Sequence, residues 1–333
     1  MGQISKSVFV TGATGFIGKY LVRSLILEGW SVSILVRDEK IAKQEFGDSC
    51  KIVVGDTTQP ATLVDIFNDI DIVYHLAALM GHDLPSGEAF LRFRAINLQG
   101  TINVVNECKL AGIKKFIYIS STAAMGLLNI SVVNENTECV PYTPYQVSKY
   151  ESEQFVINEF RKNGFPVIVL RPSMVYGPGF KGDFLTIAKL CKTGFFPKIG
   201  KGENLSPALY ITDLVNALLL FATLGKEGEV YLLSSEQSYS LDETVKIIGE
   251  TLHEKIRFIY VPVRLALLGV GLLELIYKIR KKHPPVTQRN ICSMVTDRIF
   301  DISKAKQIGF KQSIPLNVGL ANTINYFIDN KYL

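Results

Sequence analysis

The sequence predicts an α/β fold in which a doubly wound parallel sheet is followed by a smaller, mostly helical C-terminal substrate lobe. Three observations lead to this expectation. Short apolar runs alternate with helical stretches, a glycine-rich turn joins the first run to the first helix, and the alternation loosens after Arg171. Parallel strands need crossover helices on both faces of the sheet, which produces this alternation. The 333 residues suffice for one such domain with an added lobe.

Six apolar runs are expected to form strands, because each is short and is bounded by helical or turn patterns. Apolar spacing predicts helices at Gly18–Glu28, around Thr101–Leu110 and near Lys149–Lys162, with a polar helical stretch after the second strand. In chain order the expected strands are Ser7–Thr11, Val32–Val36, Lys51–Val54, Asp71–Leu76, Lys115–Ile119 and Pro166–Leu170.

The expected domain boundary lies near residue 172. Residues 1–172 form the predicted dinucleotide-binding domain, and 173–333 form a substrate lobe of helices and short strands such as Glu229–Leu233. Glycine and proline at Gly177-Pro-Gly179 and around Gly200 indicate loops rather than a flexible tether. We therefore expect the two parts to be partly interwoven.

Composition excludes several classes of protein. The chain is 47% hydrophobic with a net charge of 36 − 31 = +5, and its basic residues are mostly scattered. This pattern argues against disorder and against a nucleic-acid partner. Five cysteines without a C-x-x-C pair indicate a reducing compartment, and the four histidines are too dispersed for a metal site. No signal-peptide pattern is visible, so we expect a cytoplasmic protein that acts on a small molecule.

The glycine motif Thr11-Gly12-Ala-Thr-Gly15-Phe-Ile-Gly18 follows the first expected strand and opens the first helix. Glycines at such a turn let the backbone approach a pyrophosphate, which the free N–H groups of the helix N-terminus stabilise. The spacing is G-x-x-G-x-x-G, and the alternative is an ordinary glycine-rich turn. The strand before it and the helix after it favour dinucleotide binding, as in a Rossmann-type domain.

Tyr145 and Lys149 lie four residues apart on an expected helix and therefore share one face. A phenol transfers protons poorly near neutral pH unless a cation stabilises its phenolate, and Lys149 supplies that charge. Such pairs are also common on solvated helices. Ser120-Ser121-Thr122, directly after the fifth strand where parallel-sheet sites open, favours the catalytic interpretation.

Taken together, these motifs resemble the extended short-chain dehydrogenase/reductase family, in its epimerase/dehydratase branch. Further matching motifs occur in the family's order along nearly the whole chain. They are Gly55-Asp56, His75-Leu-Ala-Ala78, Asn97-Leu-Gln-Gly-Thr101, Arg171-Pro-Ser-Met-Val-Tyr-Gly-Pro-Gly179 and Tyr210-Ile-Thr-Asp213.

The resemblance implies roles for individual residues. Tyr145 would be the general acid/base, Lys149 would lower its pKa and hold the nicotinamide ribose, and Ser121 would hydrogen-bond the reacting oxygen, with Thr122 as the fallback. Asp56 would meet the adenine, and Ala77, Ala78 and Asn97 would line the cofactor path. The implied cofactor contacts are Gly12, Thr14, Gly15, Phe16, Ile17, Gly18, Arg37, Asp56, Thr57, Leu76, Ala77, Ala78, Asn97, Tyr145, Lys149 and Pro172.

Two of these motif residues also have structural interpretations. Asn97 fits a helix cap or turn as well as a place beside the cofactor. His75 ends an apolar strand, where a hydrogen-bonded structural histidine is favoured over a catalytic or metal-binding one.

Three functions remain open. The first is an NAD(P)-dependent oxidoreductase acting on a hydroxyl or carbonyl of a largely apolar, sterol-, flavonol- or lipid-like substrate. Ser121-Thr-Ala-Ala-Met-Gly126 resembles the pattern of dihydroflavonol reductases and hydroxysteroid dehydrogenases. The second is a nucleotide-sugar epimerase or dehydratase with tightly held NAD. The third is a non-catalytic dinucleotide sensor, against which the Ser121, Tyr145 and Lys149 set argues.

The residues after the second strand predict a preference for NADP over NAD. NAD-specific relatives place an acid there, whereas this chain has Val36 followed by Arg37. A guanidinium can bind a 2′-phosphate through two hydrogen bonds. Asp38 would occupy the position of that acid only if the alignment counted from Gly12 shifted by one residue.

The apolar stretch Val261–Ile279 has two interpretations. A helix that is apolar on nearly every face is buried in the second lobe, or it lies against lipid or an apolar substrate. The basic cluster of Lys278, Arg280, Lys281 and Lys282 favours weak peripheral association of residues 261–282 with anionic membranes. Hydroxysteroid-type relatives resemble this arrangement, in which the segment would border the substrate entrance. We also expect a homodimer.

Overall fold

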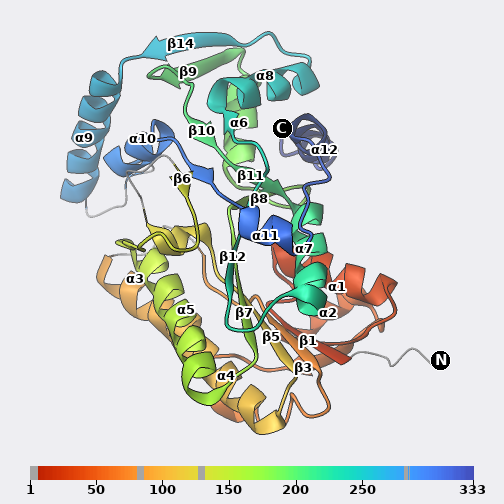
Figure 1. The fold of residues 1–333 in the computed structure, drawn as a ribbon. Helices are drawn as coiled ribbons and strands as arrows, with labels where there is room; N and C mark the ends of the chain where they lie inside the picture. Colours follow the sequence, from red (N-terminus) through yellow and green to blue (C-terminus); the bar gives the residue numbers. More distant parts are fainter. Residues whose placement is uncertain (1–6, 81–85, 127–131, 281–283, 285) are drawn as a thin grey trace.

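The computed structural model describes residues 7–80, 86–126, 132–280, 284 and 286–333. At its centre lies a seven-stranded sheet in the order β3-β2-β1-β4-β5-β7-β12, with every neighbouring pair parallel (Figure 1). This is the strand order of a doubly wound dinucleotide-binding sheet. The chain adds strands in one direction from β1 to β3, and then in the opposite direction from β4 onward. The strands are β1 (Ser7–Thr11), β2 (Ser31–Val36), β3 (Lys51–Val54), β4 (Ile72–His75), β5 (Lys115–Ile119), β7 (Val167–Pro172) and β12 (Val230–Leu233).

The sheet is buried on both faces, because alternate residues of its strands belong to different cores. On β1, Val8 and Val10 join one apolar cluster, whereas Phe9 joins the other. Residues of α1 and α7 complete the first cluster, and residues of α4 and α5 complete the second. These helices are α1 (Phe16–Leu27), α4 (Gly100–Ala111), α5 (Pro144–Asn163) and α7 (Ile211–Leu224). Because helices cover both faces, polar side chains can gather at the carboxyl edge of the sheet.

The six predicted strands are all present, and two features differ from the expectation. The run around Glu229–Leu233, expected in the second lobe, forms β12 and pairs with β7 in the main sheet. Part of the chain beyond residue 172 thus returns to the first domain. In addition, a π-helix, η2 (Arg94–Gln99), lies between α3 (Ser86–Phe93) and α4.

The second lobe sits above the carboxyl edge (Figure 1). The parallel pair β9 (Phe195–Ile199) and β14 (Arg257–Val261) forms its outer sheet. Its helices are α6 (Asp183–Cys191), α8 (Leu241–Leu252), α9 (Val263–Ile279), α10 (Gln288–Met294), α11 (Ser303–Gln307) and α12 (Leu316–Asp329).

The apolar helix α9 lies on the outside of this lobe, and none of its residues is buried. Of the two interpretations of this segment, burial in the second lobe is therefore wrong. Within the described part of the chain, no helix combines the length and hydropathy needed to cross a bilayer.

Candidate active site

The turn between β1 and α1 requires glycine at two positions, because a side chain there would clash with neighbouring backbone atoms. Gly12 has a φ of +71°, and a Cβ there would lie 2.7 Å from the Ala77 nitrogen. A Cβ on Gly18 would lie 2.2 Å from the Gly12 carbonyl oxygen. Gly15 caps α1 without a side-chain hydrogen bond, so the first-turn N–H groups face the space beside the turn. This cradle fits the pyrophosphate of a dinucleotide.

The remaining residues predicted to touch the cofactor border the same edge of the sheet. Thr14 lies in the turn, and Phe16 and Ile17 begin α1. Arg37 follows β2, Asp56 and Thr57 follow β3, Leu76, Ala77 and Ala78 follow β4, and Pro172 ends β7. The carboxyl ends of these strands bring residues that are far apart in sequence to one site.

Helix α5 carries the expected reactive pair on its inner face. It starts with a capping box, in which Thr143 accepts a hydrogen bond from the Gln146 nitrogen and the Gln146 side chain bonds back to the cap. Tyr145 and Lys149 follow at the spacing of one helical turn. The fixed start of α5 therefore sets where both side chains point.

Tyr145 meets Ser121 at the end of β5. Burial raises the pKa of the Tyr145 phenol, and its hydrogen bond with the Ser121 side chain opposes that rise. The Ser121 oxygen also accepts a hydrogen bond from the Ala123 nitrogen at 3.1 Å. Ser121, the hydroxyl that the resemblance implies, therefore interacts with the Tyr145 phenol.

Lys149 is only 3% exposed and is held beneath the site. Its Nζ donates to the Ile119 carbonyl oxygen at 2.6 Å and lies 4.6 Å from the centroid of the Tyr118 ring. Burial lowers the pKa of Lys149 to about 7, and the Glu153 carboxylate opposes this change. The charge of Lys149 therefore depends on pH near neutrality.

Glu153, one turn beyond Lys149, was missed in the sequence. Its carboxylate is 0% exposed, pairs with the buried Arg171 guanidinium of β7, and accepts a hydrogen bond from Ser120 Oγ at 2.7 Å. The four-residue spacing could have identified Glu153, because an acid one step after Tyr145 and Lys149 falls on the same inward face of the helix. Glu153 thus ties α5 to the ends of β5 and β7.

Asn97 lies inside the π-helix η2, so its interpretation as a helix cap is wrong. Its amide nitrogen donates to the Leu79 carbonyl at 3.2 Å and to Ser148 Oγ at 2.9 Å, and its oxygen accepts from the Leu79 nitrogen at 2.6 Å. Asn97 therefore joins the loop after β4 to α5, the two segments that border the expected cofactor path.

His75 is a structural histidine, as predicted. Its ring nitrogens are hydrogen-bonded to the hydroxyls of Thr11 at 2.8 Å and Thr101 at 3.0 Å. Burial, with the charge of Lys149 as a smaller contribution, lowers the pKa of His75 to about 3, so the ring is neutral at pH 7. Among the described residues, no group of three His, Cys, Asp or Glu side chains could hold a metal ion.

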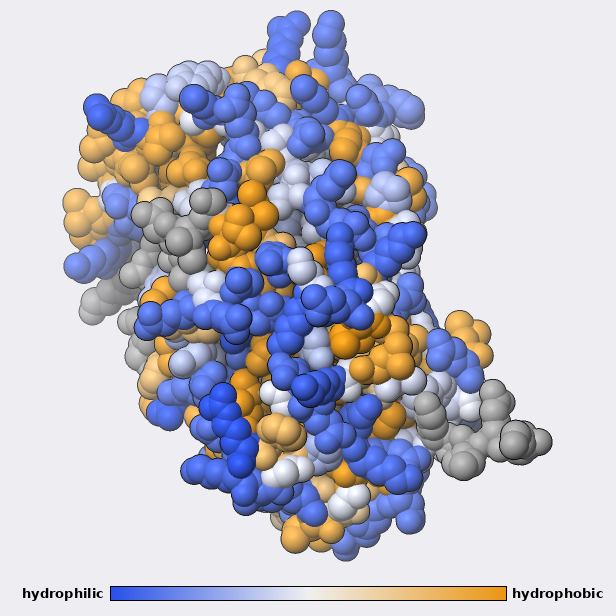
Figure 2. Space-filling view, viewed as in Figure 1, coloured by the Kyte–Doolittle hydropathy of each residue, from blue (hydrophilic) through white to orange (hydrophobic). Residues whose placement is uncertain are grey.

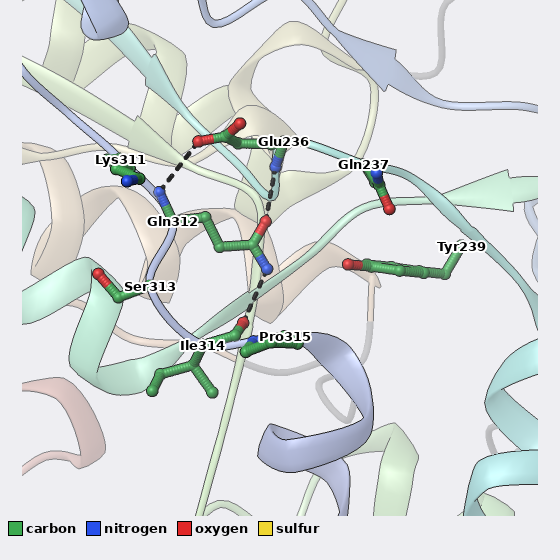
Figure 3. Close-up of a pocket in the computed structure, with 8 residues that line it drawn as sticks. All are labelled: Glu236, Gln237, Tyr239, Lys311, Gln312, Ser313, Ile314 and Pro315. Atoms are coloured by element: carbon green, nitrogen blue, oxygen red, sulfur yellow. Dashed lines mark hydrogen bonds between the residues drawn. The ribbon is translucent and has the colours of Figure 1, made fainter.

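A hollow of about 240 Å³ lies outside this site, between Glu236–Tyr239 and the segment 311–315 (Figure 3). Its polar groups bond one another. The Glu236 nitrogen donates to Gln312 Oε1, and Gln312 Nε2 donates to the Ile314 carbonyl, both at 2.8 Å. Asp213 of α7 accepts from the Ser313 and Ile314 nitrogens at 2.9 and 3.2 Å. The Tyr210-Ile-Thr-Asp213 motif thus anchors the C-terminal segment.

Comparison with known proteins agrees with this geometry. The model of the NAD dependent epimerase/dehydratase family matches residues 8–234. The chain is 27% identical to 3beta-hydroxysteroid-dehydrogenase/decarboxylase isoform 1 of Arabidopsis thaliana, over 96% of this chain and 79% of the relative. It is 30% identical to dTDP-D-glucose 4,6-dehydratase of Mus musculus, over 75% of each chain. The solved structure of MoeE5 in complex with UDP-glucuronic acid and NAD superposes with a TM-score of 0.75, at 25% identity, over 97% of this chain and 99% of that one.

Replacing Lys149 by Met should change how stability depends on pH. The pKa of Lys149 is about 7 in the folded chain, against an ordinary value of 10.5. Between these values the unfolded chain binds more protons, so the free energy of unfolding rises with pH, by at most about 1.4 kcal/mol per unit. Urea denaturation across neutral to alkaline pH should show a shallower rise in Lys149→Met. The exposed control Lys43→Met should keep the parental slope, and equal slopes in all three proteins would contradict the assignment.

Replacing Glu153 by Gln should lower the pKa of Lys149 further. The variant removes the carboxylate that favours the charged lysine and leaves the Arg171 cation unpaired, which costs about 3–5 kcal/mol of stability. The measurement is an NMR titration of the Lys149 Cε signal in carbon-13-labelled protein. Glu159 lies on the same helix as Glu153 and pairs at the surface with Lys109 of α4, so Glu159→Gln should leave the titration unchanged. An unaltered or higher pKa in Glu153→Gln would refute the coupling.

Proposed function

This chain belongs to the NAD dependent epimerase/dehydratase family and is an oxidoreductase of the short-chain dehydrogenase/reductase type, and we propose that its substrate is largely apolar. The reaction moves a hydride between a nicotinamide cofactor and a hydroxyl- or carbonyl-bearing carbon of a sterol-, flavonol- or lipid-like molecule. The observation that carries the proposed chemistry is that Tyr145 interacts with the Ser121 side chain at the end of β5, where the buried Lys149 donates to the Ile119 carbonyl.

Each residue of this group has a separate task in the proposed mechanism. The nicotinamide, when bound, accepts or donates the hydride. Tyr145 takes the proton from the substrate hydroxyl during oxidation and returns it to the carbonyl oxygen during reduction. Ser121 donates a hydrogen bond to the reacting oxygen. Lys149 stabilises the Tyr145 phenolate by its charge and holds the nicotinamide ribose, while the Gly12–Gly18 turn holds the pyrophosphate.

Two observations support an apolar substrate, and two favour a second candidate. The sterol dehydrogenase relative aligns with nearly the whole chain, and Ser121–Gly126 resembles the pattern of such enzymes. The dTDP-D-glucose dehydratase relative and the UDP-sugar complex of MoeE5 favour a nucleotide-sugar epimerase or dehydratase.

The two candidate reactions differ in net redox change. A reductase consumes NAD(P)H stoichiometrically with apolar ketones, whereas an epimerase converts UDP-sugars without net consumption. These paired assays decide between them.

We propose NADP rather than NAD as the preferred cofactor, although the cofactor named for MoeE5 is NAD. The support comes from the residues after β2. Arg37 follows the strand and is exposed, whereas the Asp38 carboxylate caps α2 (Glu39–Phe46) by accepting from the Lys40 nitrogen at 2.9 Å. A capping carboxylate is engaged with the helix instead of the ribose hydroxyls, and the guanidinium suits a 2′-phosphate.

Replacing Tyr145 by Phe should lower kcat at least about 100-fold with little change in cofactor affinity. The variant removes the proton-transferring oxygen but keeps the ring, which contacts Phe93 at a centroid distance of 5.9 Å. Steady-state kinetics and a cofactor-fluorescence titration measure the two quantities. Tyr150→Phe, on the same helix, is the matched control. Turnover of Tyr145→Phe within a few-fold of the parent would overturn the assignment.

Replacing Arg37 by Ala should weaken NADPH binding about 10- to 100-fold and leave NADH binding nearly unchanged, because only the 2′-phosphate gains charge-assisted hydrogen bonds. Fluorescence titration of both cofactors at constant ionic strength measures this difference. Lys43→Ala, which removes an exposed cation paired with Glu39, controls for general charge. Tighter binding of NADH than of NADPH by the parent protein would refute the preference.

A further inference from the structure

Helix α9 contacts the rest of the lobe along one side. It lies at the outer margin of the molecule, between β14 and α10 (Figure 1). The Gln288 backbone nitrogen donates to Glu274 Oε1 at 3.1 Å, and its side chain donates to the Leu267 carbonyl at 3.3 Å. A Cβ on Gly271 would lie 2.4 Å from the same side chain. The side that carries Leu267, Gly271 and Glu274 therefore faces α10.

The other side of α9 is an exposed apolar face. Its side chains recur at steps of three and four residues, which places them on one stripe of the helix. They are between 47% and 75% exposed. Figure 2 shows hydrophobic side chains gathered over this part of the molecule, at the upper left. The face consists of Leu265, Leu268, Leu272, Leu275, Ile276 and Ile279.

The charges on α9 and its C-cap distinguish among the partners that could cover this face. Glu274 is engaged with α10, and the other charged residues are the cations Arg264, Lys278 and Arg280. Arg264 also lines a hollow of about 360 Å³ beside Leu267 and Leu268. The sequence continues with Lys281 and Lys282, which lie outside the described residues. The apolar face is thus bordered by positive charge at both ends.

This charge pattern argues against a second copy of the chain as the partner. A twofold pairing of α9 brings the same patch of each subunit together. Arg264 of one copy would then approach Lys278 and Arg280 of the other in an antiparallel pair, and no acid of the face would compensate them. Anionic lipid headgroups neutralise such cations while their acyl chains cover the leucines.

We propose that the α9 face forms a docking surface for an anionic bilayer. The helix has 17 residues and is about 25 Å long, shorter than the hydrocarbon core of about 30 Å. It therefore lies in the plane of the headgroups, with its apolar face toward the acyl chains and Arg264, Lys278 and Arg280 at the phosphates. This proposal does not depend on the identity of the substrate.

Flotation with vesicles of phosphatidylcholine, alone or mixed with phosphatidylglycerol, tests the proposal. The parent chain should float with the mixed vesicles at low salt, less at high salt, and little with phosphatidylcholine alone. Leu268→Gln/Leu272→Gln should weaken binding to mixed vesicles at least about tenfold, and Lys278→Glu/Arg280→Glu should abolish it at low salt. Glutamine is a good helix former, and both leucines are exposed, so the fold should persist.

The matched control is Leu27→Gln/Leu110→Gln, which removes two exposed leucines far from α9 and should float like the parent. Absence of parent flotation at low salt would overturn the proposal, as would equal flotation of the α9 variants. Light scattering after gel filtration addresses the second copy. A parent dimer that Leu268→Gln/Leu272→Gln converts to a monomer would assign the face to self-association instead.

Discussion

The buried ion pair between Glu153 of α5 and Arg171 of β7 fixes the geometry on which the candidate site depends. Transferring one unpaired charge into the interior would cost several kcal/mol, so each side chain must remain where it meets the other. The same carboxylate accepts from Ser120, the neighbour of Ser121. One carboxylate thus joins the helix that carries Tyr145 and Lys149 both to β7 and to the end of β5, next to Ser121.

Burial lowers the pKa of both basic groups of this site by a similar amount, so the ordinary pKa of each group decides whether it can carry a charge near pH 7. The pKa of His75 falls from the ordinary 6.5 to about 3, so its ring, hydrogen-bonded to the hydroxyls of Thr11 and Thr101, stays neutral at pH 7. Burial lowers the pKa of Lys149 from the ordinary 10.5 to about 7, against the opposing effect of the Glu153 carboxylate. A charge is thereby retained where the proposed chemistry needs one, on a lysine that can also lose it.

The strands and the site motifs could be predicted because both depend on local signals. Apolar runs set the six predicted strands, and the four-residue spacing placed Tyr145 beside Lys149 on one face. Strand neighbours are determined by long-range packing, so the sequence could not show that β12 pairs with β7. Nor could it show the π-helix at Arg94–Gln99, which follows an ordinary helical pattern but turns Asn97 toward Leu79 and Ser148.

Helices α7 and α9 show why hydropathy alone does not separate a core helix from a surface helix. Both are rich in leucine, yet eight residues of α7 are buried between the sheet and α1, whereas none of α9 is. The two helices differ in what surrounds them. In the sequence, this difference is visible in the number and position of their charged residues. Helix α7 has Asp213 as its one charged residue, held by Ser313 and Ile314. The cations of α9 stand at its ends, where a core helix would have to bury them unpaired.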